Sequence, residues 1–370
     1  MQPLDGVRVL DFSTLLPGPM ATLLLAEAGA EVIKIERPQS GEELRGYQPR
    51  FADTSVPFAM LNRGKRSIAI DLKATDAPAQ LRPLLEAADV VVEQFRPGVM
   101  DRLGLGYATL SAINPRLVYC AITGYGQSGP RAAVAGHDLN YLADSGMLAL
   151  SAGSDGAPVV PPALIADIAG GAYPAVINIL LALQRRAITG EGCRLDVSMS
   201  DNLFPFLYWA IGNGLAAGQW PQPGGDLVTG GSPRYQIYRT ADDRFVAAAP
   251  LEQKFWENFC NAIGLAPEFR DDRRHPQATK AAVAALIRAY PSTEWRARFA
   301  GKDVCSTIAA TVEEALHDPH FAGRGLFDWG VTAGDARLPA AVVPVAPDFR
   351  ATPGDAAAPP LGEANPTLAP

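Results

Sequence analysis

The feature that most constrains the fold is a repeated alternation of short apolar runs and helical patterns in the first third of the chain. Five runs have the pattern of buried strands: residues 7–12, 31–36, 66–72, 89–93 and 116–122. Helical patterns at residues 20–28 and 79–87 lie between strands. Such alternation favours a parallel sheet with right-handed crossovers, so the sequence predicts an α/β fold with a large Rossmann-like domain.

The composition changes after residue 200, and glycine and proline dominate residues 212–233. A hairpin pattern and three helical patterns follow, at 235–240 with 244–249, then at 252–263, 279–289 and 312–317. The tail from residue 339 is rich in proline and alanine and has no helical period. We predict a large domain of residues 1–200 and 330–370, a linker at 201–232 and a smaller α+β domain at 233–329.

Charge and cysteine content exclude several classes of protein. The net charge of −7 argues against a general electrostatic hold on nucleic acid or on an acidic membrane. The apolar run at residues 163–183 contains Asp167, two glycines and a proline, so we predict no membrane span. The first residues lack a signal-peptide pattern, which favours a cytoplasmic protein. The widely separated cysteines fit reduced thiols: Cys120, Cys193, Cys260 and Cys305.

The segment GYGQSGP at residues 124–130 matches a dinucleotide-binding pattern and follows a predicted strand. Pro130 lies where a helix should begin, and no strand carrying an acid for a ribose follows about twenty residues later. We therefore favour a structural loop over a nucleotide site.

Asp167 is the only charged residue in the apolar stretch from residue 157 to residue 184. A carboxylate in such surroundings loses hydration, its pKa rises, and it can act as a general base or a nucleophile. An Asp before an apolar helix is also typical of an N-cap, so both interpretations stay open. Gly170 and Gly171 favour a site, because small residues let a ligand approach the backbone.

His137 and Asp138 lie in the segment GHDLNY, soon after the glycine loop. A lone histidine is more often a hydrogen-bonded loop residue than a catalytic one, and the sequence pattern leaves this choice open. His317 and His320 flank Pro319 and offer too few ligands for a metal ion. We predict a helix end and a turn there, and no metal site.

Cationic residues gather in three segments near strand ends. Arg37 follows the second predicted strand, the segment NRGKR at residues 62–66 precedes the third, and Arg96 and Arg102 follow the fourth. Loops at the ends of parallel strands hold ligands in doubly wound folds, so this placement indicates a phosphate-rich ligand. Solvated loop charge explains any one of these residues taken alone.

Several motifs resemble those of the family III CoA-transferase (CaiB/BaiF-type) superfamily, and within it those of the α-methylacyl-CoA racemase branch. They are GVRVLD (6–11), PGP (17–19), GAEVIKIERP (29–38), NRGKRS (62–67), RPG (96–98), GLG (104–106), GYGQSGP (124–130) and ADIAGG (166–171). The resemblance implies that both chain ends complete the large domain and that two chains form an interlocked homodimer. It also implies an acyl-CoA substrate bound by Arg37, Lys65, Arg66, Ser67, Arg96, Arg102, Gly136, Asp138, Leu139, Asn140 and Tyr141.

The resemblance implies one of two reactions at Asp167. In the transferases of the superfamily, the matching Asp attacks the acyl-CoA thioester, forms an anhydride and passes CoA to another carboxylic acid. His137 and Glu252, the latter within LEQKFW at residues 251–256, are similar to the racemase pattern, in which the Glu partners the His. The expected protein is an isomerase of lipid metabolism that interconverts (2R)- and (2S)-2-methylacyl-CoA thioesters.

Such a racemase removes the α-proton, forms an enolate and returns a proton to the opposite face, which requires a base on each face. The resemblance assigns these bases to Asp167 and His137, with Glu252 orienting His137. Backbone N–H groups near Asp167 are expected to stabilise the enolate oxygen. No cofactor is expected, because the CoA thioester is itself the substrate. An apolar bed for the acyl group is expected from Phe204, Phe206, Tyr208 and Trp209.

Overall fold

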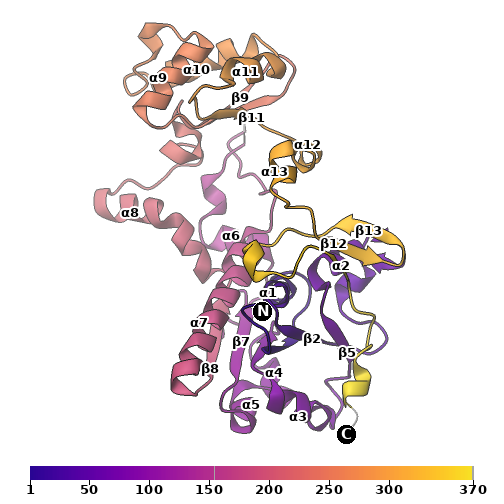
Figure 1. The fold of residues 1–370 in the computed structure, drawn as a ribbon. Coiled ribbons are helices and arrows are strands. Elements are labelled where there is room, and N and C mark those ends of the chain that lie inside the picture. The colour runs from indigo at the N-terminus through magenta and orange to yellow at the C-terminus, as the bar shows by residue number, and fades with distance from the viewer. Residues whose placement is uncertain (154, 369–370) are drawn as a thin grey trace. The chain divides into compact units, whose positions relative to one another are not determined.

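The computed structural model describes residues 1–153 and 155–368, and the chain forms two compact units (Figure 1). The larger unit consists of Met1–Ser145, Pro161–Phe206 and Arg324–Pro370. The smaller unit consists of Gly146–Val160 and Leu207–Gly323. The larger unit is therefore assembled from segments that lie far apart in the sequence.

A six-stranded parallel sheet forms the centre of the larger unit. From edge to edge, its strands are β5 (Arg66–Ala69), β2 (Glu31–Glu36), β1 (Arg8–Phe12), β6 (Val90–Glu93), β7 (Val118–Thr123) and β8 (Cys193–Ser198). Numbered along the chain, this order is 3-2-1-4-5-6, in which ligands bind where the order reverses, beside β1 and β6. The prediction of an α/β fold with a parallel sheet is confirmed.

The sequence patterns did not reveal β8. In this strand, the charged residues Arg194 and Asp196 are exposed and alternate with Leu195 and Val197. The strand lies at the edge of the sheet, so it lacks the continuous apolar run that marks the central strands.

Helices cover both faces of the parallel sheet. The helices of the larger unit are α1 (Pro17–Glu27), α2 (Val56–Asn62), α3 (Ala77–Ala87), α4 (Val99–Arg102), α5 (Tyr107–Ile113), α6 (Asp138–Asp144) and α7 (Tyr173–Thr189). Leu10 and Ile33 belong to the core under α3, α4 and α5. Alternate strand residues point to the opposite face, where α1 and α7 pack. The PGP motif at residues 17–19 forms the start of α1, because proline fits the first position of a helix.

The stretch Ala166–Thr189 is long and apolar enough to cross a membrane when judged by length and composition alone. The core helix of a globular protein passes the same test. Here α7 packs against β7 and β8.

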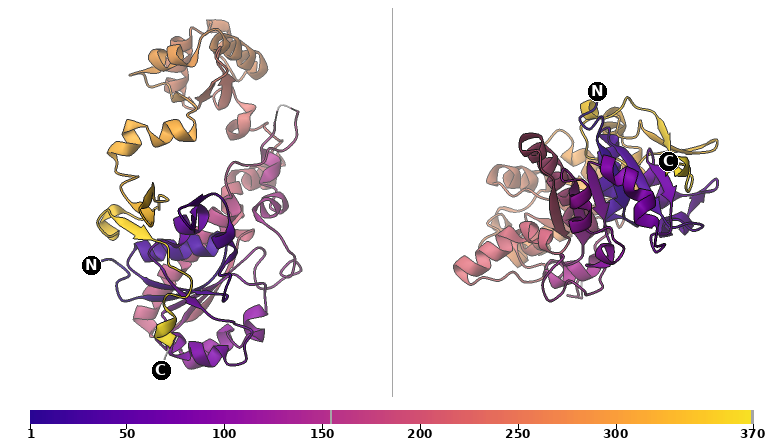
Figure 2. Two further views of the ribbon diagram at one scale, coloured as in Figure 1. Left: turned by 90° about the vertical axis from the view of Figure 1, so that its right-hand side faces the viewer. Right: turned by 90° about the horizontal axis from the view of Figure 1, so that it is seen from below.

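The C-terminal segment runs back along the larger unit (Figures 1 and 2). It contains β12 (Gly330–Ala333), β13 (Ala336–Pro339) and β14 (Asp355–Ala357), with β12 in the middle of a small sheet. Further on, the Ala364 N–H donates to the Ser67 carbonyl at 2.9 Å, beside β5. A short hairpin of β3 (Arg50–Phe51) and β4 (Thr54–Ser55) precedes α2.

The smaller unit has an α+β architecture. Its antiparallel sheet has the order β11 (Ser306–Ile308), β10 (Phe245–Ala248) and β9 (Gln236–Arg239), and β9 and β10 form the predicted hairpin. Its core includes Trp256 and Trp295. The helices are α8 (Tyr208–Ala217), α9 (Gln253–Ile263), α10 (Pro276–Arg288), α11 (Ser292–Phe299), α12 (Val312–Leu316) and α13 (Pro319–Gly323). The segment predicted as a linker, residues 201–232, contains α8.

Candidate active site

A cavity of about 410 Å³ lies in the larger unit, at the carboxyl ends of β1, β6 and β7. This is the end of a doubly wound sheet at which ligands bind. We call it the catalytic cavity. Its wall is formed by Leu15, Pro17, Gln94, Phe95, Arg96, Pro97, Ile122, Thr123, Gly124, Ala132, Val134, Ala135, Gly136, His137, Asn140, Tyr141, Asp167 and Met199.

Asp167 reaches the catalytic cavity from a π-helical turn, Ala166–Ala172, which leads into α7. Such turns are uncommon and occur often at functional sites. A Cβ atom on Gly170 would lie 2.4 Å from the Met199 carbonyl oxygen, and one on Gly171 would lie 3.1 Å from Cβ of Pro17. The two glycines therefore let the π-turn pack against its neighbours. This packing explains both glycines, and their role in admitting a ligand stays a prediction.

The surroundings of Asp167 favour its protonated form. Burial raises the pKa of Asp167 to about 6, the carboxylate of Asp138 adds to the rise, and His137 opposes it. The carboxyl group of Asp167 therefore exchanges its proton close to neutral pH, as a general acid or base must.

His137 and Asp138 occupy the start of α6. His137 is the N-cap residue, and its N–H donates to Oδ1 of Asn140 at 3.0 Å. Asp138 is buried, and its Oδ1 accepts the backbone N–H of Asp167 at 3.0 Å. The structure thus brings His137, Asp138 and Asp167 together, while Leu139 is exposed and does not line the cavity. The Asp167 N–H is engaged by Asp138 and is not free to bind an enolate oxygen. That other backbone N–H groups near Asp167 bind this oxygen stays a prediction.

The glycine-rich loop after β7 packs against Tyr141. The hydroxyl of Tyr141 donates to the Gly136 carbonyl at 2.5 Å, and a Cβ atom on Gly124 would lie 2.5 Å from the Tyr141 ring. No helix begins before Asp138 in this part of the described chain. This arrangement lacks the helix N-terminus that holds a pyrophosphate in dinucleotide-binding folds.

Two polar residues of the cavity wall, Thr123 and Gln94, were not predicted. Thr123 is buried, and its hydroxyl has no hydrogen-bond partner among the residues that the structure describes. Gln94 accepts the Gly18 N–H through its Oε1 at 3.0 Å. Their positions directly at or after the ends of β7 and β6 are the signal that could have found them.

A second cavity, of about 680 Å³, lies at the carboxyl ends of neighbouring strands of the same sheet. Arg37 and Lys73 line it. Arg102 is exposed at the end of α4, between Val99 and Leu103, which also belong to this wall. Of the predicted CoA-binding cations, Arg37 therefore lines the second cavity and Arg96 the first, and Arg102 is next to Leu103 of the second cavity's wall.

Three predicted CoA-binding residues have other roles. Lys65 is buried, and its ammonium group donates to Asp11, Thr22, Asn62 and the Pro19 carbonyl. Arg66 pairs with Glu31, at the amino ends of β5 and β2. Ser67 is buried and donates to Glu36. These contacts occupy the three side chains, and none of the three lines either cavity, so their assignment to CoA binding stays a prediction.

Glu252 belongs to the smaller unit, where it is the N-cap residue of α9. Its role as partner of His137 stays a prediction. Phe204 and Phe206 belong to the larger unit and Tyr208 and Trp209 to the smaller one, so the acyl bed also stays a prediction. Among the described residues, no group of three or more His, Cys, Asp or Glu side chains is arranged to hold a metal ion.

The chain is similar to known proteins along almost its whole length. The family model for CoA-transferase family III matches residues 4–365. Human α-methylacyl-CoA racemase is 36% identical over 332 residues, which cover 88% of this chain and 82% of the relative. The succinate–glutarate CoA-transferase of Agrobacterium fabrum is 34% identical over 340 residues, which cover 88% of this chain and 84% of the relative.

Solved structures of the same family also resemble the fold of this chain. A CaiB/BaiF family protein from Brucella suis superposes with a TM-score of 0.84 at 29% identity, and the match covers 100% of both chains. Relatives with racemase and transferase names match to similar degrees, so the comparisons show the family and leave the reaction to be argued from the site. The chain belongs to CoA-transferase family III.

Proposed function

We propose that this enzyme is an acyl-CoA racemase that interconverts (2R)- and (2S)-2-methylacyl-CoA thioesters. The observation that carries the proposal is that Asp167, whose pKa is raised to about 6, and the imidazole of His137 line one cavity. A racemase needs two such proton carriers, one on each face of the α-carbon. A transferase needs only the carboxylate as its nucleophile.

In the proposed reaction, one of the two groups removes the α-proton, and the C–H electron pair moves into the thioester to form an enolate. The other group, in its protonated form, gives its proton to the opposite face of the α-carbon. Asp167 and His137 exchange these roles for the two enantiomers, so each turnover leaves the enzyme with its two groups in exchanged protonation states. Glu252 orients His137 in this proposal. The chain supplies both proton carriers, and the reaction requires no metal or redox cofactor.

The acyl-CoA would bind across both cavities of the larger unit. The second cavity, with Arg37 and Arg102 beside it, suits the phosphates and the nucleotide end of CoA. Arg96 lies at the catalytic cavity, together with Gly136, Asn140 and Tyr141, where the thioester end would lie. Asp138 acts here through Asp167, whose amide it binds.

We also propose an interlocked homodimer and a place in the cytoplasm. The outer face of α7 exposes four apolar residues at helical spacing: Ile177, Leu180, Leu181 and Ile188. A second copy of the chain would cover this face. Light scattering after gel filtration is expected to show a dimer for the wild type and a monomer for Leu181→Asp, and a monomeric wild type contradicts this part of the proposal. The four free cysteines fit a reducing compartment.

The proposed activity is tested by incubating one enantiomer of a 2-methylacyl-CoA with the enzyme in deuterated water. We expect α-deuterium to be incorporated and optical purity to be lost, and we expect Asp167→Asn to slow both by about 10²–10⁴-fold. The matched control Asp335→Asn removes an exposed carboxylate in a turn and should leave both rates unchanged. A wild-type enzyme that neither incorporates deuterium nor loses optical purity sinks the proposal.

The second candidate is a CoA-transferase that works through an anhydride at Asp167, and its support is the transferase relative with 34% identity. Hydroxylamine would then convert Asp167 to a hydroxamate in the presence of an acyl-CoA, and CoA would move to a free acid. His137→Asn separates the two reactions, because it should abolish racemisation of one enantiomer or both while a transferase keeps most of its rate.

A further inference from the structure

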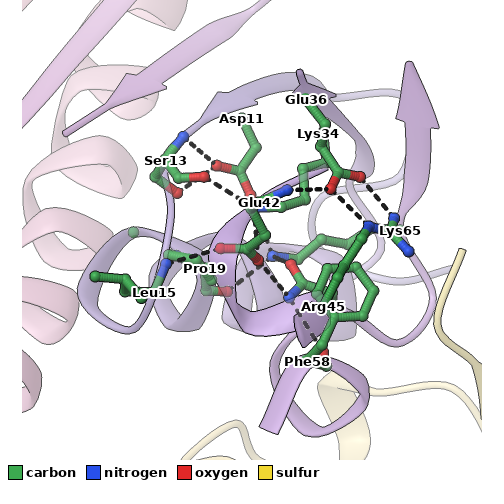
Figure 3. A network of polar contacts seen from close by, with 12 residues as sticks. Asp11, Ser13, Leu15, Pro19, Lys34, Glu36, Glu42, Arg45, Phe58 and Lys65 are labelled. Carbon is green, nitrogen blue, oxygen red and sulfur yellow. Dashed lines mark hydrogen bonds and ion pairs between the residues drawn. The ribbon is translucent and has the colours of Figure 1, made fainter. Parts of the chain in front are cut away.

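Four charged side chains form a buried cluster beneath the loop that joins β1 to α1 (Figure 3). Asp11, Lys34, Glu42 and Lys65 are 0%, 0%, 3% and 5% exposed. Nζ of Lys34 lies 3.3 Å from Oε1 of Glu42 and 3.8 Å from Oδ2 of Asp11. Nζ of Lys65 lies 3.1 Å from the same Asp11 oxygen. Two cations and two carboxylates thus balance one another; we call them the charge cluster.

Stability alone does not explain the charge cluster. Burial of ions costs hydration, and replacing a buried ion network by apolar side chains is often neutral or stabilising. The charge cluster is therefore expected to have a function other than stabilising the fold. The contacts that the cluster makes with the backbone indicate that function.

The charge cluster binds three backbone groups of the β1–α1 loop, two of Ser13 and one of Leu15. The Ser13 N–H donates to Oδ1 of Asp11 at 2.9 Å, and the Ser13 carbonyl accepts from Nζ of Lys34 at 2.9 Å. The Leu15 N–H donates to Oε2 of Glu42 at 2.8 Å. Asn62 fixes Glu42 in turn, by donating to its Oε1 at 3.1 Å.

The loop needs this support because Leu15 has a left-handed backbone, with a φ of 61°. That conformation costs a residue with a side chain about 1–2 kcal/mol and persists only where the surroundings impose it. Leu15 lines the catalytic cavity together with Asp167. The strained residue is therefore also a part of the wall that a substrate meets.

We propose that Glu42 is a positioning residue of the active site: by binding the Leu15 N–H, it holds the left-handed backbone and so places the Leu15 side chain against the bound acyl-CoA. This inference rests on the proposed acyl-CoA function. Leu15 carries no proton to exchange, so its contact acts equally on the ground state and the transition state. Loss of the contact should then raise KM and leave kcat nearly unchanged.

The test compares Glu42→Gln in the wild-type background with the same change in a Leu15→Ala background. The amide keeps the shape of Glu42 but offers a single acceptor oxygen in place of two. We expect KM for a 2-methylacyl-CoA to rise about tenfold in the wild-type background and less than about threefold in the Leu15→Ala background, because the two residues act through one contact. Hydrogen exchange of the amides at residues 13–16 should become faster in Glu42→Gln. The control Glu86→Gln removes an exposed carboxylate of α3 and should change neither quantity.

Equal rises of KM in both backgrounds, or a fall of kcat at constant KM, overturn the proposal. Leu15→Asn covers the case in which Glu42→Gln does not fold. Asn adopts the left-handed backbone readily, so this variant should keep slow exchange at residues 13–16 and still bind the thioester more weakly. Normal binding by Leu15→Asn overturns the proposal as well. Unchanged amide exchange in a folded Glu42→Gln would show that Glu42 does not hold the β1–α1 loop, and would overturn the proposal. A wild type that binds no acyl-CoA would refute the proposed function. The exchange result would then test only whether Glu42 holds the loop.

Discussion

Asp11 and Asp167 are both shielded carboxylates of the larger unit, and their surroundings are opposite. Burial alone would raise the pKa of Asp11, but Lys34 and Lys65, with the hydroxyls of Ser13 and Thr22, hold it far below its usual range. Burial raises the pKa of Asp167 to about 6, and its anionic neighbour Asp138 adds to that rise. One carboxylate is fixed in its ionised form, and the other is left ready to take up a proton.

This difference shows how one residue type serves two purposes. Where buried cations and hydroxyls satisfy a carboxylate, it holds the backbone in place, as Asp11 holds Ser13. Where a carboxylate lies in a cavity and no lysine or arginine of the described residues compensates its burial, its pKa moves toward neutrality and it can carry protons. The charge of its neighbours, rather than its burial, decides which role an aspartate has here.

The largest change in the free energy of unfolding is expected at Asp11, whose charge is compensated by two lysines. Asp11→Asn removes the anion that neutralises Lys34 and Lys65, so two buried cations are left with Glu42 alone. We expect a loss of about 3–5 kcal/mol in the free energy of unfolding, measured by urea denaturation near neutral pH. The control Asp335→Asn should change it by less than about 0.5 kcal/mol. A loss below about 1 kcal/mol for Asp11→Asn would mean that the cluster does not depend on this charge.

At Asp167, removal of the charge is expected to raise the free energy of unfolding rather than lower it. Its ionised form is unfavourable in the folded protein, so Asp167→Asn should raise the free energy of unfolding at pH 8 by up to about 2 kcal/mol. The same variant should slow racemisation by about 10²–10⁴-fold. The variant resembles the protonated acid in shape and charge. Denaturant unfolding of both proteins at this pH measures the difference, and a destabilised variant contradicts the comparison.

The stability that Asp167→Asn gains over the wild type should also depend on pH. Its folded pKa, about 6, lies above the ordinary value of 3.8, so between these values the folded state binds more protons than the unfolded state. The wild type therefore keeps its full stability contribution from this group below about pH 4 and loses it as the pH rises through 6. Unfolding free energies of wild type and Asp167→Asn should converge at low pH, and curves that stay parallel from pH 4 to pH 8 contradict this expectation.

The smallest effect concerns Thr123, whose buried hydroxyl lacks a partner among the described residues, whereas the groups of the charge cluster are paired. Thr123→Val keeps the shape and removes the unsatisfied hydroxyl. We expect the free energy of unfolding to rise by up to about 1 kcal/mol, seen as a higher midpoint of thermal unfolding. A lower midpoint would show that the hydroxyl is satisfied in solution.

Much of the fold could be predicted because burial leaves a local trace. Central strands such as Val90–Glu93 are continuous apolar runs, and their alternation with helices predicts a parallel sheet. The edge strand Cys193–Ser198 leaves no such trace, since its outer residues are charged. The π-turn at Asp167 has no local pattern at all, because it depends on the contact between Gly170 and Met199.

The candidate site was predictable to the extent that each residue stood out from its neighbours. Asp167 is a single charge in an apolar stretch, and the structure places it in the catalytic cavity. Lys65 looked like a loop cation, and only the fold reveals that Asp11, far away in the sequence, is its partner. Leu15 carried no signal, because its left-handed backbone is imposed by Glu42 through a long-range contact.

Asp167 is expected to exchange its proton near neutral pH, whereas Asp11 is expected to stay ionised. The most direct test is a ¹³C NMR titration of the side-chain carboxyl groups of the full-length protein, with the two signals assigned by Asp167→Asn and Asp11→Asn. We predict a titration at about pH 6 for Asp167 and no titration of Asp11 down to the pH at which the protein unfolds. A midpoint for Asp167 at or below its ordinary value of 3.8 would contradict the account.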